Sequence, residues 1–284
     1  MSTVEIRRRS DRVPGPDYYT DELLDTVDLE HARSTWSHVR VNHGFAPGYA
    51  PNLIQHGGNA KLSKSDRIGK PTYGLTLAPA RVSGFNQCSH STPECRADCL
   101  FTAGRGGFNS VQRARICKTV FLERFPLESR ALMRHQLRNI ARQHGRKHWA
   151  SRMNVTSDRD WSEPWYAAIC EPAAVNPYAY TKVGAHLTGP NGAGIDYTWS
   201  VSEREPGVSH ILPLIDAGTR CAVVIGGDVK VPDTVEGHPV FSMDDHDYRP
   251  ADPVGIGVLT AKGSARDRIP SASGFVKSAE WFAA

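Results

Sequence analysis

The 284-residue sequence lacks a long hydrophobic run: nowhere do about 18 apolar residues follow one another, as a transmembrane helix requires. Its first residues are charged and hold no apolar segment, so we expect neither a secretory signal nor a membrane partner. Cysteine is also scarce, and three of the six cysteines are bunched together, which is not the pattern of a secreted disulfide framework. These absences favour a cytoplasmic protein in a reducing compartment.

Neither sign of charge dominates the chain. The 34 basic and 30 acidic residues give a formal net charge of +4, so the total charge alone does not indicate a nucleic-acid partner. Hydrophobic residues make up 39%, and a chain of this length can bury roughly three quarters of its unfolded surface in a core. The distribution of residues is therefore more informative than their totals.

Short apolar segments alternate with helical patterns after residue 71. We expect a first strand at 72–78 and two helices at 110–125 and 127–144, with Pro126 ending the first helix. Strands that alternate with crossovers predict parallel βαβ units, and we expect an α/β fold with a partial or complete parallel (β/α) barrel. The remaining predicted strands span residues 149–156, 178–181, 195–201, 221–225 and 255–260.

The first part of the chain has a different composition. A basic start is followed by one short amphipathic helix, roughly 20–39, and by a stretch rich in glycine, proline and asparagine. We therefore expect a partly ordered N-terminal arm over residues 1–55 and a single α/β barrel-like domain over residues 56–284.

Three cysteines, Cys88, Cys95 and Cys99, fall within twelve residues on a glycine-flanked loop that follows the first predicted strand. Core cysteines have no reason to cluster, whereas thiolates gather around soft cations. One interpretation is a [4Fe-4S] cluster with three protein ligands, which leaves one iron open to a substrate or cofactor. A second is structural zinc completed by His90 or Cys117, and a third is free or partly buried thiols. The other cysteines, Cys117, Cys170 and Cys221, lie in helical or apolar runs that are typical of packing.

Polar side chains follow each predicted strand. In parallel barrels the active site gathers at the carboxyl ends of the strands, so these residues are expected to face one cavity. The candidate catalytic residues are Asn154, Asp158, Lys182, Ser202 and Glu203, and the candidate cofactor-binding residues are Gly226, Gly227, Asp228 and Lys262. The alternatives are a helix cap for Asp158 and an ion pair between Lys182 and Glu203.

Two further patterns carry charge. An acidic segment at 244–252 could bind Mg²⁺ or act as acid and base, or could be a solvated turn held by Arg249. Arginines recur every four residues along one flank of the helix at 127–144 and could contact phosphates, or could form a solvated surface. The candidate nucleic-acid contacts are Arg130, Arg134, Arg138 and Arg142.

The run LAPARVSGFNQCSHSTPECRADCLFTAGRGGFNSVQRARICKT resembles the phage gene-eighty-eight protein family, and agreement continues through RMNVTSDRDW, YAYTK, SVSERE, MDDHDYRPADP and LTAKGSARD. The resemblance covers roughly residues 59–276 and implies a phage or plasmid context but no reaction. A cysteine loop after the first strand of a parallel barrel is also similar to radical S-adenosylmethionine enzymes. In those enzymes the motif is CxxxCxxC, whereas here six and then three residues separate the cysteines.

These patterns predict a phage-related metalloprotein. The first interpretation is an iron–sulfur, radical-S-adenosylmethionine-like enzyme acting on a small molecule or nucleobase, with S-adenosylmethionine as a second cofactor. The alternative is a zinc-stabilised protein without catalytic activity that binds nucleic acid through the arginine helix.

Overall fold

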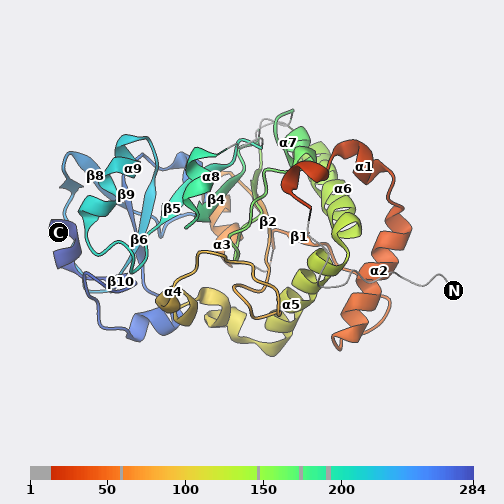
Figure 1. Cartoon of the computed structure of the whole chain (residues 1–284), viewed down its shortest axis with the longest axis horizontal. Helices are drawn as coiled ribbons and strands as arrows, with labels where there is room; N and C mark the ends of the chain where they lie inside the picture. Colours follow the sequence, from red (N-terminus) through yellow and green to blue (C-terminus); the bar gives the residue numbers. More distant parts are fainter. Residues whose placement is uncertain (1–13, 58–59, 146–147, 173–174, 190–192) are drawn as a thin grey trace.

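The computed structural model of the chain describes residues 14–57, 60–145, 148–172, 175–189 and 193–284. It has a mixed α/β fold with two sheets and mostly parallel strands, so the predicted α/β class with parallel strands is confirmed. In Figure 1 the long helices lie on one side of the first sheet, and the strands of the second sheet occupy the other half of the molecule. No helix in the described ranges is long and apolar enough to cross a membrane.

The N-terminal residues that are described fold against the helices. Instead of the single predicted helix there are two, α1 (Asp21–Asp25) and α2 (Leu29–Asn42), because Thr20 and Asp28 each cap a helix start. Trp36 of α2 is 1% exposed and packs against Phe121 of the helix that follows the cysteine loop. Residues 14–55 thus contribute to the main core, whereas the predicted basic start lies outside the described residues.

Two long helices follow the cysteine loop, as predicted. They are α5 (Asn109–Arg124) and α6 (Pro126–His144). Pro126 cannot continue α5 because it has no backbone N–H, but its fixed φ angle suits the first turn of α6.

The first sheet has three strands, β1 (Ile54–Gln55), β2 (Thr72–Leu75) and β3 (Ala150–Arg152). β1 is antiparallel to β2, and β2 is parallel to β3. A parallel bridge between Ser151 and Pro177 then joins β3 to the first strand of the second sheet.

The second sheet continues with β4 (Tyr178–Thr181), β5 (Asp196–Ser200), β6 (Cys221–Ile225) and β9 (Ile256–Thr260), all parallel. From β2 to β6 each strand therefore lies beside the next one along the chain. The sheet ends with β8 (His238–Ser242), which is parallel to β9, and β7 (Thr234–Val235); β10 (Val276–Lys277) pairs with β6.

Shorter helices fill the connections between these strands. The α-helices are α3 (Ala60–Ser63), α4 (Pro93–Ala97), α7 (Pro164–Cys170), α8 (Gly184–Thr188) and α9 (Leu212–Asp216). The 3-10 helices span Pro16–Tyr18, Lys64–Ile68, Leu100–Thr102, Gly104–Gly107, Val208–His210, Arg249–Ala251, Gly263–Asp267 and Ala279–Ala283.

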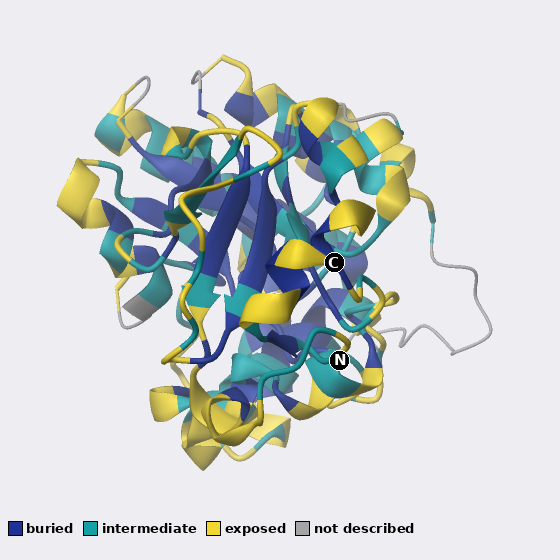
Figure 2. Ribbon diagram, turned by 90° about the vertical axis from the view of Figure 1, so that its left-hand side faces the viewer, coloured by how far each residue is buried: buried dark blue, intermediate teal, exposed yellow. Residues whose placement is uncertain are grey.

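The two faces of this strand array differ in chemistry. Because side chains alternate along a strand, registered neighbours share a face. The outer face carries apolar side chains that pack in the two main cores: Leu75, Met153, Ala179, Trp199, Cys221, Val223, Ile256 and Val258. The inner face carries Arg152, Tyr178, Tyr180, Asp196, Thr198 and Ser200. Figure 2 shows that the strands are largely buried between exposed helices and loops.

Candidate functional site

The three clustered cysteines lie on the loop between β2 and α5, and each is half-buried. Cys88 forms a parallel bridge with Asp158, so the loop runs alongside the segment that follows β3. Cys95 lies in α4, which begins after the Thr92 cap, and Cys99 lies two residues beyond that helix. The loop therefore places the thiols at the carboxyl ends of β2 and β3.

The thiols are within electrostatic range of one another. The pKa of Cys88 is raised to about 11, mainly by burial; a hydrogen bond with the Ala80 backbone opposes the shift, and the nearby Asp158, Cys99 and Cys95 add to it. Burial also raises the pKa of Cys99, with Cys95 adding to the shift and the Lys61 and Arg115 cations opposing it. Among the described residues, no three histidine, cysteine or acidic side chains are grouped closely enough to hold a metal ion.

Residues from distant strand ends hold the cysteine loop. The carboxylate of Glu203, after β5, accepts hydrogen bonds from Thr92 Oγ1 at 2.6 Å and from the Glu94 backbone N–H at 2.9 Å. Burial would raise the pKa of Glu203, but these hydrogen bonds and the Lys182 ammonium lower it below its ordinary value. Asp98 forms an ion pair with Arg268 at 2.5 Å. Glu203 thus positions α4, with one hydrogen bond to each of its carboxylate oxygens.

Asn154 and Asp158 organise the segment after β3. The side-chain oxygen of Asn154 accepts hydrogen bonds from Ser157 Oγ, the Arg159 backbone and Trp161 Nε1, at 2.9–3.1 Å, and its amide donates to the Arg159 carbonyl. Asn154 is 2% exposed, so its hydrogen-bonding capacity is used within this turn. Asp158 accepts a hydrogen bond from the Lys182 backbone N–H at 2.8 Å and lies 3.6 Å from His186 Nδ1. Asp158 therefore links the Cys88 segment to the end of β4.

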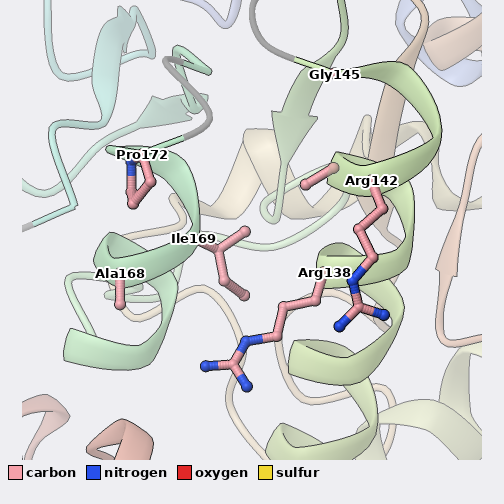
Figure 3. A pocket seen from close by; sticks show the side chains of 7 residues that line it. Arg138, Arg142, Gly145, Ala168, Ile169 and Pro172 are labelled. Atoms are coloured by element: carbon pink, nitrogen blue, oxygen red, sulfur yellow. The ribbon is translucent and has the colours of Figure 1, made fainter.

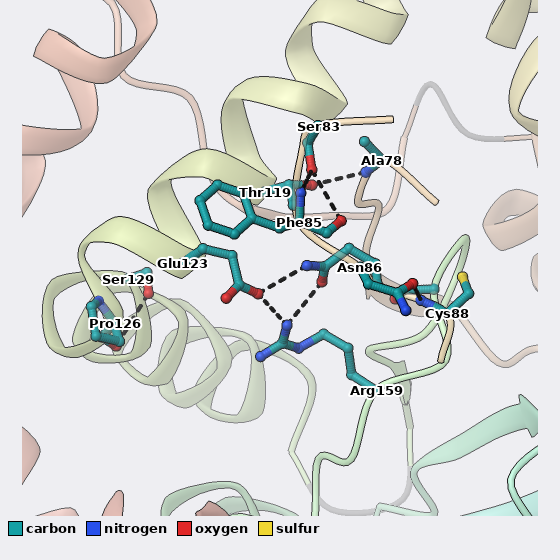
Figure 4. Close-up of polar contacts among 12 residues, drawn as sticks. Ala78, Ser83, Phe85, Asn86, Cys88, Thr119, Glu123, Pro126, Ser129 and Arg159 are labelled. Atoms are coloured by element: carbon teal, nitrogen blue, oxygen red, sulfur yellow. Dashed lines mark hydrogen bonds and ion pairs between the residues drawn. The ribbon is translucent and has the colours of Figure 1, made fainter. Parts of the chain in front are cut away.

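Figure 4 shows the polar contacts between the Cys88 segment and helix α5. Arg159 forms an ion pair with Glu123 of α5 and also donates to Gln87 Oε1 at 2.9 Å. Gln87 donates to the same Glu123 carboxylate at 2.9 Å, so the residue before Cys88 is fixed to both α5 and the segment after β3.

Lys182 and Ser202 have different surroundings. Lys182 Nζ donates a hydrogen bond to Ser200 Oγ at 2.5 Å and lies 5.7 Å from the centre of the Phe275 ring. Ser202 is 2% exposed, and its hydroxyl donates to Glu205 at 3.0 Å. Lys182 consequently faces the interior beside β5, whereas Ser202 stabilises its own turn.

A charged group that the sequence did not single out lies on the inner face. Arg152 Nη1 and Asp247 Oδ2 are 2.5 Å apart, and the Tyr178 hydroxyl donates to the same oxygen at 3.0 Å. The Arg152 guanidinium also lies 4.9 Å from the Tyr180 ring centre. The pKa of Lys61 is lowered to about 8, mainly by burial; Arg152 adds to the shift, whereas Asp247 and Cys99 oppose it, so Lys61 is within electrostatic range of both this group and the cysteine loop.

The acidic segment supports the inner face. Asp244 pairs with Lys262, Asp247 with Arg152, and Asp252 with the fully buried Arg249 at 3.0 Å. Since these carboxylates already have cationic partners, the arrangement agrees with the structural interpretation of the segment, in which Arg249 pairs with an acid.

The candidate cofactor-binding residues follow the neighbouring strands β6 and β9, and their surroundings differ. Gly226 lies beneath Pro270, with only 2.4 Å between an added Cβ and Pro270 Cγ, whereas Gly227 has open space around it and Asp228 is exposed. Lys262, two residues after the end of β9, forms an ion pair with Asp244.

The arginine helix pairs largely with its own chain. Arg130 forms two hydrogen bonds to Glu163 at 2.7 and 2.8 Å and is 2% exposed. Arg134 is 6% exposed and pairs with Asp21 at 3.0 Å and with Asp25. These two guanidinium groups are thus engaged internally and fasten α1 and α7 to α6.

Arg138 and Arg142 are more accessible. They line a pocket of about 320 Å³ between α6 and α7, above an apolar floor that includes Ile169 (Figure 3). Arg138 also pairs with Asp21 at 2.9 Å, and Arg142 donates to Asn139 at 3.0 Å. Nucleic-acid contact through this helix stays a prediction, restricted to these two residues.

Sequence reasoning missed Lys61, Arg152, Tyr180 and Thr198. One signal was available: β4 and β5 read Tyr178-x-Tyr180-x-Lys182 and Asp196-x-Thr198-x-Ser200, so polar residues recur every second position in two buried strands. Parallel strands covered on both faces usually read as continuous apolar runs, and this departure indicates a polar inner face.

Fold and site together define an α/β protein that carries a cysteine-rich loop at the carboxyl ends of parallel strands. The chain belongs to the phage family described as Gene product 88, whose family model matches residues 52–278. No curated protein and no solved structure matches the chain. The predicted family and its phage context are thereby confirmed.

Proposed function

We propose that this protein is an iron–sulfur enzyme, with a [4Fe-4S] cluster bound by Cys88, Cys95 and Cys99 and with radical-S-adenosylmethionine-like chemistry on a small molecule or nucleobase. The observation that carries the proposal is the position of the three thiols: one loop carries them, within electrostatic range of one another, at the carboxyl ends of β2 and β3. In parallel α/β folds this end of the strands is where ligands bind.

The donor set suits such a cluster. Iron–sulfur clusters are held by cysteine thiolates, and three soft donors lie on one loop. Lys61 and Arg115 lie within electrostatic range of Cys99 and would offset part of the negative charge of a bound cluster. Gly84 and Gly104 flank the cysteines with φ angles of +86° and +52°, and glycine can change its backbone conformation at low steric cost. Closure of the loop around the ligand is therefore part of the proposal.

The strand order supports a partial barrel. From β2 to β6 each strand lies beside its successor, as in a barrel, and beyond β6 the order is β9, β8 and β7. When bound, a reduced cluster supplies one electron to S-adenosylmethionine or to a substrate. The residues of the inner face would bind and orient the substrate there, and the apolar outer face would keep the strands rigid.

Metal analysis after purification without oxygen tests the proposal. We expect iron and sulfide in matching amounts, a brown colour, and no stoichiometric zinc. Cys99→Ser should lose most of the iron, whereas Cys221→Ala, a change at a buried outer-face cysteine, should retain it. Stoichiometric zinc without iron would overturn the iron–sulfur assignment and favour the zinc alternative. Equal iron content in Cys99→Ser and the wild type would overturn the choice of ligands.

S-adenosylmethionine is the first small molecule to test. With dithionite as the reductant, we expect the reduced protein to convert S-adenosylmethionine to methionine and 5′-deoxyadenosine, since one electron cleaves the sulfonium C–S bond and the adenosyl carbon then takes a hydrogen atom from a donor. A protein that holds iron and sulfide but leaves S-adenosylmethionine intact would limit the function to electron transfer.

A further inference from the structure

The inner face ends in a row of polar side chains from two adjacent strands. Tyr180 and Lys182 come from β4 and the residue after it, and Thr198 and Ser200 stand opposite them on β5. Tyr180, Lys182 and Ser200 are half-buried, whereas Thr198 is 0% exposed. The row therefore combines one ammonium and three hydroxyl groups at the carboxyl ends of parallel strands.

Two hydroxyl groups of the row, and a guanidinium nitrogen on the nearby strand β3, form no hydrogen bond with a described residue. In the part of the chain that the structure describes, Thr198 Oγ1 is buried without a hydrogen-bond partner, and so is Arg152 Nε. The Tyr180 hydroxyl forms no hydrogen bond to a described residue. A buried polar atom without a partner costs free energy, so native proteins seldom keep one without a ligand or a water to satisfy it.

Lys182 is the one cation of the row, and the carboxylate within its electrostatic range, Glu203, already accepts hydrogen bonds from the cysteine loop through both oxygens. Lys182 Nζ contacts the neutral Ser200 hydroxyl and the Phe275 ring and forms no ion pair with a described carboxylate. Behind the row, the carboxylate of Asp247 already pairs with Arg152, and that of Asp252 with Arg249. An ammonium with neutral partners, next to unsatisfied donors, suits an anionic group.

We propose that Lys182, Ser200, Thr198 and Tyr180 form a binding site for the phosphate or carboxylate group of a small-molecule substrate. This proposal deepens the proposed function, because it names the substrate as an anion, and so favours a nucleotide over a free nucleobase. The site lies beside the cysteine loop: Asp158, bridged to Cys88, accepts a hydrogen bond from the Lys182 backbone N–H. A substrate held there by its anionic group would lie next to the proposed cluster.

Thermal unfolding with added anions tests the site. Inorganic phosphate and acetate are titrated at constant ionic strength, with chloride as the reference anion, and half-saturation is read from the rise in Tm. We expect phosphate, acetate or both to stabilise the wild type more than chloride does; the stronger of the two identifies the anionic group. Lys182→Met should raise the anion concentration at half-saturation by about tenfold or more, because a charge-assisted contact is lost. Lys230→Met, a change at an exposed lysine, should not alter it.

Two further measurements make the result decisive. Thr198→Val and Ser200→Ala should each weaken anion binding, which keeps the test valid if Lys182→Met does not fold. Iron and sulfide are measured on the same samples, and Lys182→Met should keep the wild-type content. Equal stabilisation by all three anions, or wild-type anion affinity in all three variants, would overturn the anion site and leave the iron–sulfur proposal standing. Loss of iron in Lys182→Met would also overturn it, because the lysine would then act on the cluster.

Discussion

The outer and inner faces of the same strands follow different rules of stabilisation. Outer-face side chains such as Val223 and Ile256 are buried among apolar helix residues, so their stability comes from surface removed from water. The inner face instead buries ions and hydroxyl groups, and each must find a partner or cost stability. Proteins tolerate such a face where it serves binding or chemistry, and this difference is the reason why we propose the binding site on the inner face.

The largest effect should come from breaking an inner-face ion pair. Asp247→Ala leaves Arg152 buried without its carboxylate and removes the acceptor of the Tyr178 hydroxyl. We expect a loss of about 3–5 kcal/mol in the free energy of unfolding, measured with a chemical denaturant. The double variant Arg152→Met/Asp247→Leu should recover much of this loss, because no charge is left unpaired. A loss under about 1 kcal/mol for the single variant would contradict the buried pair.

Two buried threonines allow a buried hydroxyl with hydrogen-bond partners to be compared with one that has none among the described residues. Thr119 is 0% exposed, and its Oγ1 accepts from the Ala78 N–H and donates to the Arg115 carbonyl, both at 2.9 Å. Thr119→Val should therefore lower the free energy of unfolding by about 1–3 kcal/mol.

The matched change on the inner face is Thr198→Val, where the buried hydroxyl has no partner among the described residues. We expect no loss of stability there, or a small gain, because the substitution removes an unsatisfied group. Destabilisation equal to that of Thr119→Val would show that Thr198 is engaged within the protein rather than kept for a ligand. Both variants are compared with the wild type by the same denaturant titration.

Stability should also depend on pH through a lysine buried among neutral oxygens. Lys118 donates to the Leu53 carbonyl at 3.1 Å and to Gln55 Oε1 at 3.0 Å, and burial lowers its pKa to about 7. Between pH 7 and 8.5 the unfolded chain keeps this proton while the folded chain loses it, so stability rises with pH. The contribution is about 1–2 kcal/mol over that range. Lys118→Met should flatten the rise; an unchanged slope would contradict the assignment.

The fold could be predicted where local sequence decides it. β4 and β6 were predicted at their observed bounds, because a short apolar run bounded by turn residues is typical of a buried strand. β10 has only two residues, and it pairs with β6, which lies far from it in the sequence. No local pattern therefore predicts this strand. The same limit applies to β1 and to the short helices.

The candidate site was predictable in part. The cysteine spacing pointed to the loop, and Lys182 at the end of β4 does face the interior. The arginines of α6 looked like a surface stripe, because nothing local shows that Arg134 pairs with Asp21, more than a hundred residues earlier. The partners of Asn154 could not be predicted for a similar reason, because they are set by the shape of the turn rather than by its position after a strand.

The contacts of the cysteine loop also bear on the order of events during synthesis. Glu94 accepts a hydrogen bond from the Phe275 backbone at 2.6 Å, and the Ala97 carbonyl accepts one from Ser264 at 3.1 Å. The ribosome makes these partners roughly 170–180 residues after the thiols. The loop can therefore take its final position only after residues 264–275 have been synthesised, because both of these contacts depend on them. The position of α4 and of its three neighbouring thiols is thus set by contacts that span most of the length of the chain between β2 and β10.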